Sequence, residues 1–122
     1  MDRIAEGLKL RRKRFAVAVL DFVETFPRTS AGDALSCQLA RSGLGVAGNY
    51  RGACRARSHT EFTARPGIVL EEADDSERWL ELSADRNMGD ASKRAWLVDE
   101  SVQLRAIFKA CTTARSREHR RR

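Results

Sequence analysis

The residues whose pattern comes nearest to a known chemical motif are the six from Gly43 to Gly48, which read Gly-Leu-Gly-Val-Ala-Gly and match the GxGxxG pattern of dinucleotide-binding turns. In those turns the glycines let the backbone approach a pyrophosphate at a helix N-terminus, directly after a β-strand. Here the flanking residues follow a helical pattern, and no segment of the chain alternates with the period of a strand. We interpret the glycines as small residues at a helix crossing, because each costs about 1 kcal/mol relative to alanine in a helix and needs a packing reason. No cofactor is expected.

A run of acidic residues follows in the third quarter of the chain. Carboxylates on facing helices of a bundle can bind two iron ions, but that chemistry requires Glu-x-x-His pairs, and the two histidines stand elsewhere, at positions 59 and 119. We expect a solvated, salt-bridged face with no metal, in which Asp74 pairs with Arg78 one turn later. The run consists of Glu71, Glu72, Asp74, Asp75, Glu77, Glu81 and Asp85.

For two candidate nucleophiles, Cys54 and Ser58, a structural role explains the residue better than a catalytic role does. Cys54 lies among three arginines that would favour its thiolate, but no histidine is placed by the sequence to act as its base, and free cysteines are commonly buried. Ser58 precedes Glu61 by three residues and so forms a capping box at a helix start, without a GxSxG elbow. We therefore expect no enzymatic activity and no small-molecule substrate. Three widely spaced cysteines, an odd number, fit free thiols in a reducing cytoplasm.

The formal charge of +6 is concentrated at the two ends of the chain. Residues 1–14 carry six Lys/Arg against two acids, residues 115–122 carry five Arg against one acid, and residues 15–114 sum to −2. Clustered cations neutralise phosphates and release counterions, which predicts salt-sensitive binding of RNA or DNA. A solvated helix face with a frayed tail explains the same residues equally well. The three arginines around Cys54 are candidate phosphate contacts as well, and they are also candidate partners of the acidic run. The full set of candidate phosphate contacts is Lys9, Arg11, Arg12, Lys13, Arg14, Arg51, Arg55, Arg57, Arg115, Arg117, Arg120, Arg121 and Arg122.

Four helical segments position these residues, because apolar side chains recur along each at steps of three, four or seven. The expected helices span about 3–26, 31–52, 59–85 and 91–114, and they form one domain, 1–114, followed by a disordered basic tail, 115–122. The expected inward faces are Ile4, Leu8, Phe15, Val19, Phe22 and Phe26; Leu35, Leu39, Val46 and Tyr50; Phe62, Val69, Ala73, Ser76 and Leu80; and Leu97, Ser101, Leu104, Phe108 and Cys111.

Helix boundaries are predicted from caps and breakers. Ser30 with Asp33 resembles a capping box for the second helix, and Asn87 and Gly89 mark the loop 86–90 before the fourth. Pro66 either kinks the third helix or opens it at the first helical position, which would make the Ser58 box a decoy. Four helices of similar length with short connections predict an all-α, antiparallel, up-and-down four-helix bundle. The sequence has no apolar stretch of the roughly 20 residues that a membrane span needs.

A family resemblance rests on several of these residues together: Asn49-Tyr50-Arg51, Cys54 to Ser58, Glu61-Phe62, and Glu71 to Asp74 leading to Trp79-Leu80-Glu81-Leu82. From about Phe15 to Cys111 the chain resembles the bacterial four-helix-bundle proteins of the 23S rRNA intervening-sequence family, although Pro66 departs from the pattern. The superfamily includes the accessory variability protein of diversity-generating retroelements. The resemblance implies a homopentamer that binds nucleic acid or a reverse transcriptase. The alternative is a protein-interaction scaffold using Ala16, Val17, Leu20 and Val23 of the first helix.

Overall fold

The computed structural model describes the backbone of residues 3–54 and 59–121, and the side chains of 3, 6–48, 67–114, 116–118 and 120. Within these ranges four α-helices follow one another along the chain: α1 (Arg3–Val23), α2 (Ser30–Cys54), α3 (His59–Asp85) and α4 (Ala91–Arg121). No β-strand occurs in the described residues. None of these helices is both long enough and apolar enough to cross a membrane.

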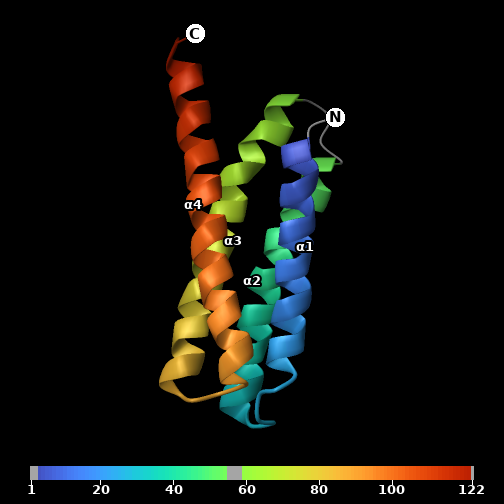
Figure 1. Cartoon of the computed structure of the whole chain (residues 1–122), viewed down its shortest axis with the longest axis vertical. Coiled ribbons are helices and arrows are strands. Elements are labelled where there is room, and N and C mark those ends of the chain that lie inside the picture. Colours follow the sequence, from blue (N-terminus) through green and yellow to red (C-terminus); the bar gives the residue numbers. More distant parts are fainter. Residues whose placement is uncertain (1–2, 55–58, 122) are drawn as a thin grey trace.

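The helices are arranged as an up-and-down bundle (Figure 1). Each helix contacts its neighbours in sequence, and α4 returns to contact α1, whereas among the described residues no Cα atoms of the diagonal pairs, α1 with α3 and α2 with α4, come within 8 Å of each other. This confirms the predicted all-helical bundle. The contacts between α1 and α4 are sparser than those of the other three adjacent pairs, so this seam is the least tightly closed.

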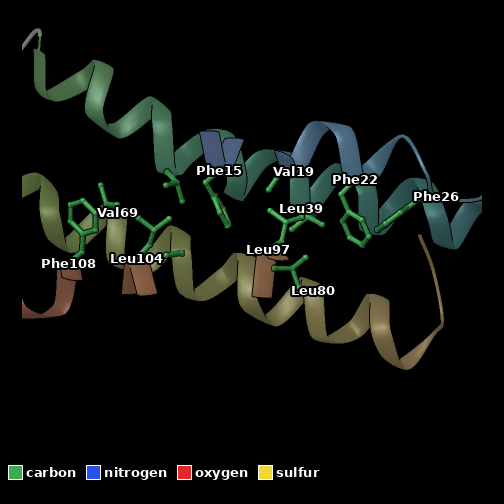
Figure 2. Close-up of a cluster of buried hydrophobic side chains, with 12 residues drawn as sticks. Phe15, Val19, Phe22, Phe26, Leu39, Val69, Leu80, Leu97, Leu104 and Phe108 are labelled. Carbon is green, nitrogen blue, oxygen red and sulfur yellow. The ribbon is translucent and has the colours of Figure 1, made fainter. Parts of the chain in front are cut away.

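A continuous apolar core runs along the bundle axis, with side chains from all four helices (Figure 2). Of the predicted inward residues with described side chains, Leu8 and Leu35 are half-buried and Cys111 is exposed; the others are buried, as predicted. The buried serines donate their hydroxyls to carbonyls of the preceding turn, so that they are satisfied inside the core. The core consists of Phe15, Val19, Phe22, Phe26, Leu39, Val46, Val69, Ala73, Leu80, Leu97, Leu104 and Phe108.

The first helix ends at Val23, three residues before the predicted boundary. The amides of Thr25 and Phe26 then bond to the carbonyls three residues earlier, which tightens the last turn. Phe26 nevertheless stays in the core, because its ring meets that of Phe22 edge to face at a centroid distance of 5.0 Å and an interplanar angle of 87°. The apolar period therefore located the buried side chain correctly but not the helix end.

The cap of α2 is Thr29 rather than the predicted Ser30. The Thr29 hydroxyl accepts a hydrogen bond from the amide of Gly32 at 3.0 Å, and its carbonyl accepts the first helical bond from Asp33 at 2.8 Å. Ser30 is the first helical residue. The two hydroxyl residues are adjacent, and the sequence alone favoured the one that has an acid three residues later.

The α3 to α4 connection is a Schellman turn followed by an aspartate cap. Asn87 takes a left-handed conformation, φ 53°, while the amide of Met88 bonds to the carbonyl of Ser83 at 2.8 Å. Gly89 has φ 82°, where only glycine is unstrained. Asp90 then caps α4 by accepting from the amide of Lys93 at 2.9 Å. Loop residues 86–90 lie where the sequence predicted them.

The third helix begins at His59, seven residues before Pro66, so Pro66 does not open it. The residue before the helix, Ser58, lies outside the described residues, as does its proposed capping box. The side chains of Tyr50 and Phe62 also lie outside the described part.

The fourth helix continues to Arg121, where the sequence analysis predicted a disordered tail from residue 115. Residues 110–121 contain no glycine or proline, and alanine, arginine and glutamate are good helix formers. Arginines near a helix C-terminus also interact favourably with its dipole. Cys111 lies on this longer helix three residues beyond Phe108, the last residue of α4 in the described core, and its side chain is exposed.

Candidate nucleic-acid interface

The antiparallel arrangement brings the two basic ends of the sequence to one end of the bundle. The first turns of α1 and the last turns of α4 lie at the end opposite the two turns 24–29 and 86–90 (Figure 1). We call the end with the start of α1 and the last turns of α4 the open end, and the end with the two turns 24–29 and 86–90 the turn end. The turn end is held together by a hydrogen bond from the amide of Asp90 to the hydroxyl of Thr25, at 2.9 Å.

Charge is separated along the long axis of the molecule. The contacts of Arg11 with Glu100 and of Gly45 with Glu72 set the level at which the bundle divides. In the half next to the turn end, residues 15–44 and 73–99, ten acidic residues outnumber six basic ones, giving −4. In the other half, the described side chains comprise ten basic and five acidic residues, giving +5. A surface of one sign attracts ligands of the other sign and raises their rate of association. The basic side chains of the open half are Arg3, Lys9, Arg11, Arg12, Lys13, Arg14, Arg105, Lys109, Arg117 and Arg120, and its acidic ones are Glu6, Glu71, Glu72, Glu100 and Glu118.

Five of the predicted phosphate contacts are exposed: Lys9, Lys13 and Arg14 on α1, and Arg117 and Arg120 on α4. Their two helices are far apart in sequence but reach the same end of the bundle (Figure 1). The structure therefore places both clusters toward the same end of the bundle, with the α4 cluster further along the axis than the α1 cluster.

Arg11 is engaged in the seam between α1 and α4. Its guanidinium donates to both carboxylate oxygens of Glu100, at 3.0 and 2.7 Å, and to Gln103 at 3.1 Å. The hydrogen bond to Glu100 raises the pKa of Arg11. A two-point guanidinium–carboxylate pair of this kind fixes orientation as well as adding energy. Arg11 thus joins two helices, and its charge is largely compensated by Glu100.

Arg12 is a correction to the predicted interface, because it is buried. Only 5% of its surface is exposed. Its Nε donates to the carbonyl of Val46 at 2.7 Å, and its guanidinium lies 5.5 Å from the centre of the Phe108 ring, a cation–π distance. Arg12 stands three residues before Phe15 and seven before Val19, so the helical period already placed it on the buried face. Its charge had led us to assign it to the surface.

Six other predicted contacts cannot be placed at side-chain level. Arg55 and Arg57 lie outside the described residues, and the side chains of Arg51, Arg115, Arg121 and Arg122 lie outside the described part as well. The same holds for the side chain of Cys54. Among the cysteines, Cys37 and Cys111 are free thiols on the surface.

The acidic run on α3 pairs with Arg105 of α4 and with Arg78 of α3 itself. The arginines around Cys54, its other predicted partners, have side chains outside the described part. Arg105 contacts Asp74 at 3.7 Å and Glu77 at 3.2 Å. The predicted Asp74–Arg78 pair is present at 3.6 Å, and Asp75 takes the same arginine at 3.3 Å. These ion pairs flank a shallow groove of about 510 Å³ between the two helices, lined by Leu70, Glu71, Asp74, Val102, Arg105, Ala106 and Lys109.

The glycines of the GxGxxG match lie inside α2; Gly43 and Gly45 lie at helix contacts, whereas a Cβ at Gly48 would meet nothing within 4 Å. A Cβ at Gly43 would lie 2.8 Å from the methyl groups of Val19 on α1, and one at Gly45 would lie 2.7 Å from the carboxyl group of Glu72 on α3. At Gly43 the obstacle is a buried β-branched side chain, whereas at Gly45 it is the end of a flexible side chain that can move. Burial and the neighbouring acids Asp75 and Glu71 raise the pKa of the Glu72 carboxyl.

Comparison with known proteins supports this architecture. No protein-family model matches the chain, and no curated protein matches it. Its fold is similar to the crystal structure of a protein of unknown function from the S23 ribosomal protein family of Bacteroides thetaiotaomicron, with a TM-score of 0.74 and 24% sequence identity. The similarity covers 84% of this chain and 95% of that chain. It confirms the helical-bundle fold and is consistent with the resemblance to the 23S rRNA intervening-sequence family.

Proposed function

We propose that the protein is a non-enzymatic member of the 23S rRNA intervening-sequence family that binds nucleic acid through the open end of its bundle. The observation that carries this proposal is the separation of charge: ten basic side chains against five acidic ones among the described side chains of the open half, and a net −4 in the turn half. A polyanion approaching this field meets attraction at one end and repulsion at the other, which orients it.

Binding of this kind depends on phosphate charge rather than on base sequence. Each phosphate neutralised on duplex DNA changes the slope of log affinity against log salt by about −0.9. Lys13 and Arg14 are both exposed on α1, so replacing both with alanine should make the slope shallower by about 1.8 and weaken binding to duplex and single-stranded probes alike. Neither substitution touches the core.

A matched control removes the same charge from the opposite end. Arg86 and Lys93 are exposed at the turn end, and the double substitution Arg86→Ala/Lys93→Ala has the same change in net charge. We expect it to leave affinity and slope nearly unchanged. Fluorescence anisotropy across a salt series checks both variants. Equal losses from the two variants would show that net charge alone is responsible, and no binding at low salt would overturn the proposed function.

A second candidate is a self-associating scaffold, and exposed apolar residues on α1 favour it. Leu10 and Val17 lie two turns apart on one face and are 46% and 50% exposed, and Leu20 follows three residues later at 39%. Of the residues proposed earlier for such an interface, Ala16 is buried and Val23 packs against the core, so the surface is narrower than expected. We propose that this stripe joins copies of the chain, for which the family resemblance implies five subunits. Light scattering on the protein samples used for the binding assays measures the molecular mass of the particle in solution. The mass of a monomer would exclude association through this stripe.

A further inference from the structure

The last turns of α4 extend past α1. Arg11 bonds to Gln103, and eight residues further along each antiparallel helix bring Arg3, where α1 begins, level with Cys111. Residues after Cys111 therefore have no described part of α1 beside them. Figure 1 shows the end of α4 diverging from α3 as well. We call residues 109–121 the distal segment of α4.

Nothing in the distal segment would pack it onto the bundle. After Phe108 the largest apolar residues are alanine and cysteine. All of its described side chains are exposed except Thr112, which is half-buried and bonds to the carbonyl of Phe108 at 2.8 Å. Since helices in proteins are stabilised mainly by burial of an apolar face, this segment is available to pack against something else.

One face of the distal segment carries only hydrogen-bond donors and small side chains. At 100° per residue, Lys109, Thr113, Ser116, Arg117 and Arg120 fall within an arc of about 100°, while Glu118 lies well outside it. All five side chains are exposed. The small residues at 113 and 116 permit close approach of the helix backbone, and the two arginines, three residues apart, extend from the same side.

We infer that the distal segment binds in the major groove of duplex DNA. This inference rests on the proposed function and specifies duplex DNA as the class of nucleic acid that is bound. The segment is about 20 Å long and a helix is about 10–12 Å in diameter, matching the roughly 12 Å width of that groove in B-form DNA. The major groove of A-form RNA is deep and narrow and does not admit it. Arginine can donate to guanine in the DNA groove as well as to phosphate.

The test must separate the helical shape of the segment from its charge. Ala114 is an exposed residue in the middle of the segment, and Ala114→Pro breaks the helix there while keeping every charge. Ala114→Ser is the matched control, since it keeps the helix. Anisotropy measures the affinity of each full-length protein for a DNA duplex of about 16 base pairs, enough for more than one turn, and for the RNA duplex of the same sequence. Circular dichroism and the unfolding midpoint confirm that the bundle is intact.

We expect wild type and Ala114→Ser to bind the DNA duplex about tenfold or more tighter than the RNA duplex. Ala114→Pro should lose about tenfold on DNA and bind RNA within about twofold of wild type. Competition supports the groove assignment if methyl green, a major-groove ligand, displaces the protein more effectively than netropsin, a minor-groove ligand. Equal affinity for both duplexes, or full DNA affinity in Ala114→Pro, overturns this inference and leaves electrostatic binding by the open end in place. Absence of any binding overturns the proposed function too.

Discussion

Gly43 offers the sharpest test of how α1 and α2 pack. Its replacement by alanine would place a Cβ 2.8 Å from both methyl groups of Val19 and 2.9 Å from its Cβ. Val19 is completely buried, and a β-branched residue in a helix has one strongly preferred rotamer. The methyl groups therefore cannot turn away, and the overlap must be relieved by moving one helix against the other.

The size of the effect follows from two opposing contributions. Overpacking of a core costs about 1–3 kcal/mol, and alanine gains about 1 kcal/mol over glycine in helix propensity. Gly43→Ala should thus reduce the free energy of unfolding by up to about 2 kcal/mol. Gly7 lies in α1 with nothing within 4 Å of a built Cβ, so Gly7→Ala should stabilise by about 1 kcal/mol. The same chemical change is expected to have opposite signs at the two sites.

Urea denaturation followed by circular dichroism measures both variants. Removing the obstacle should reverse the sign at Gly43, and this takes Val19→Gly, because alanine at position 19 would keep the Cβ that lies 2.9 Å away. In the Val19→Gly background, itself destabilised by about 2.5–4 kcal/mol, Gly43→Ala should become stabilising by about 1 kcal/mol. The reasoning is refuted if Gly43→Ala stabilises the wild-type protein as much as Gly7→Ala does. It also fails if the effect of Gly43→Ala is the same with and without Val19.

Two further predictions concern charged side chains inside the bundle. Arg94 donates to Ser83 at 3.0 Å and to the carbonyl of Met88, so Arg94→Met should lower the free energy of unfolding by about 1.5–3 kcal/mol, while Lys93→Met, at an exposed neighbour, should change it by less than about 0.5 kcal/mol in the same urea assay. Comparable losses at both positions would contradict a role for the Arg94 hydrogen bonds. Burial raises the pKa of Glu72 above its ordinary value of 4.5, so the folded state binds this proton more tightly than the unfolded state, and stability falls as pH rises from 4.5 through the folded pKa. Glu72→Gln should therefore raise the melting temperature at pH 7, with the gain vanishing below pH 4.5; a gain that does not depend on pH would count against burial of the charge.

The apolar period of the sequence was enough to predict four helices and nearly all of the described core. Burial of one stripe is a local property of each helix, so Phe15, Val69 and Leu104 could be assigned without knowing their partners. The loop at Asn87 and Gly89 was predictable for the same reason, because positive φ is a local requirement. Of the candidate interface, Lys13 and Arg14 were identified from their charge and are exposed as expected.

Properties of a residue that depend on where a second helix lies could not be predicted from the sequence. The burial of Arg12 requires Val46 and Phe108 from two other helices, and the need for glycine at position 43 arises only where Val19 crosses it. The separation of charge between the two ends of the bundle also requires the antiparallel order of the helices. The sequence by itself determined the elements and their buried faces, since these follow from the period of single helices. Only the tertiary structure decided which cations stay on the surface and gather at one end, because electrostatic and steric contacts between helices depend on distances that sequence separation does not encode.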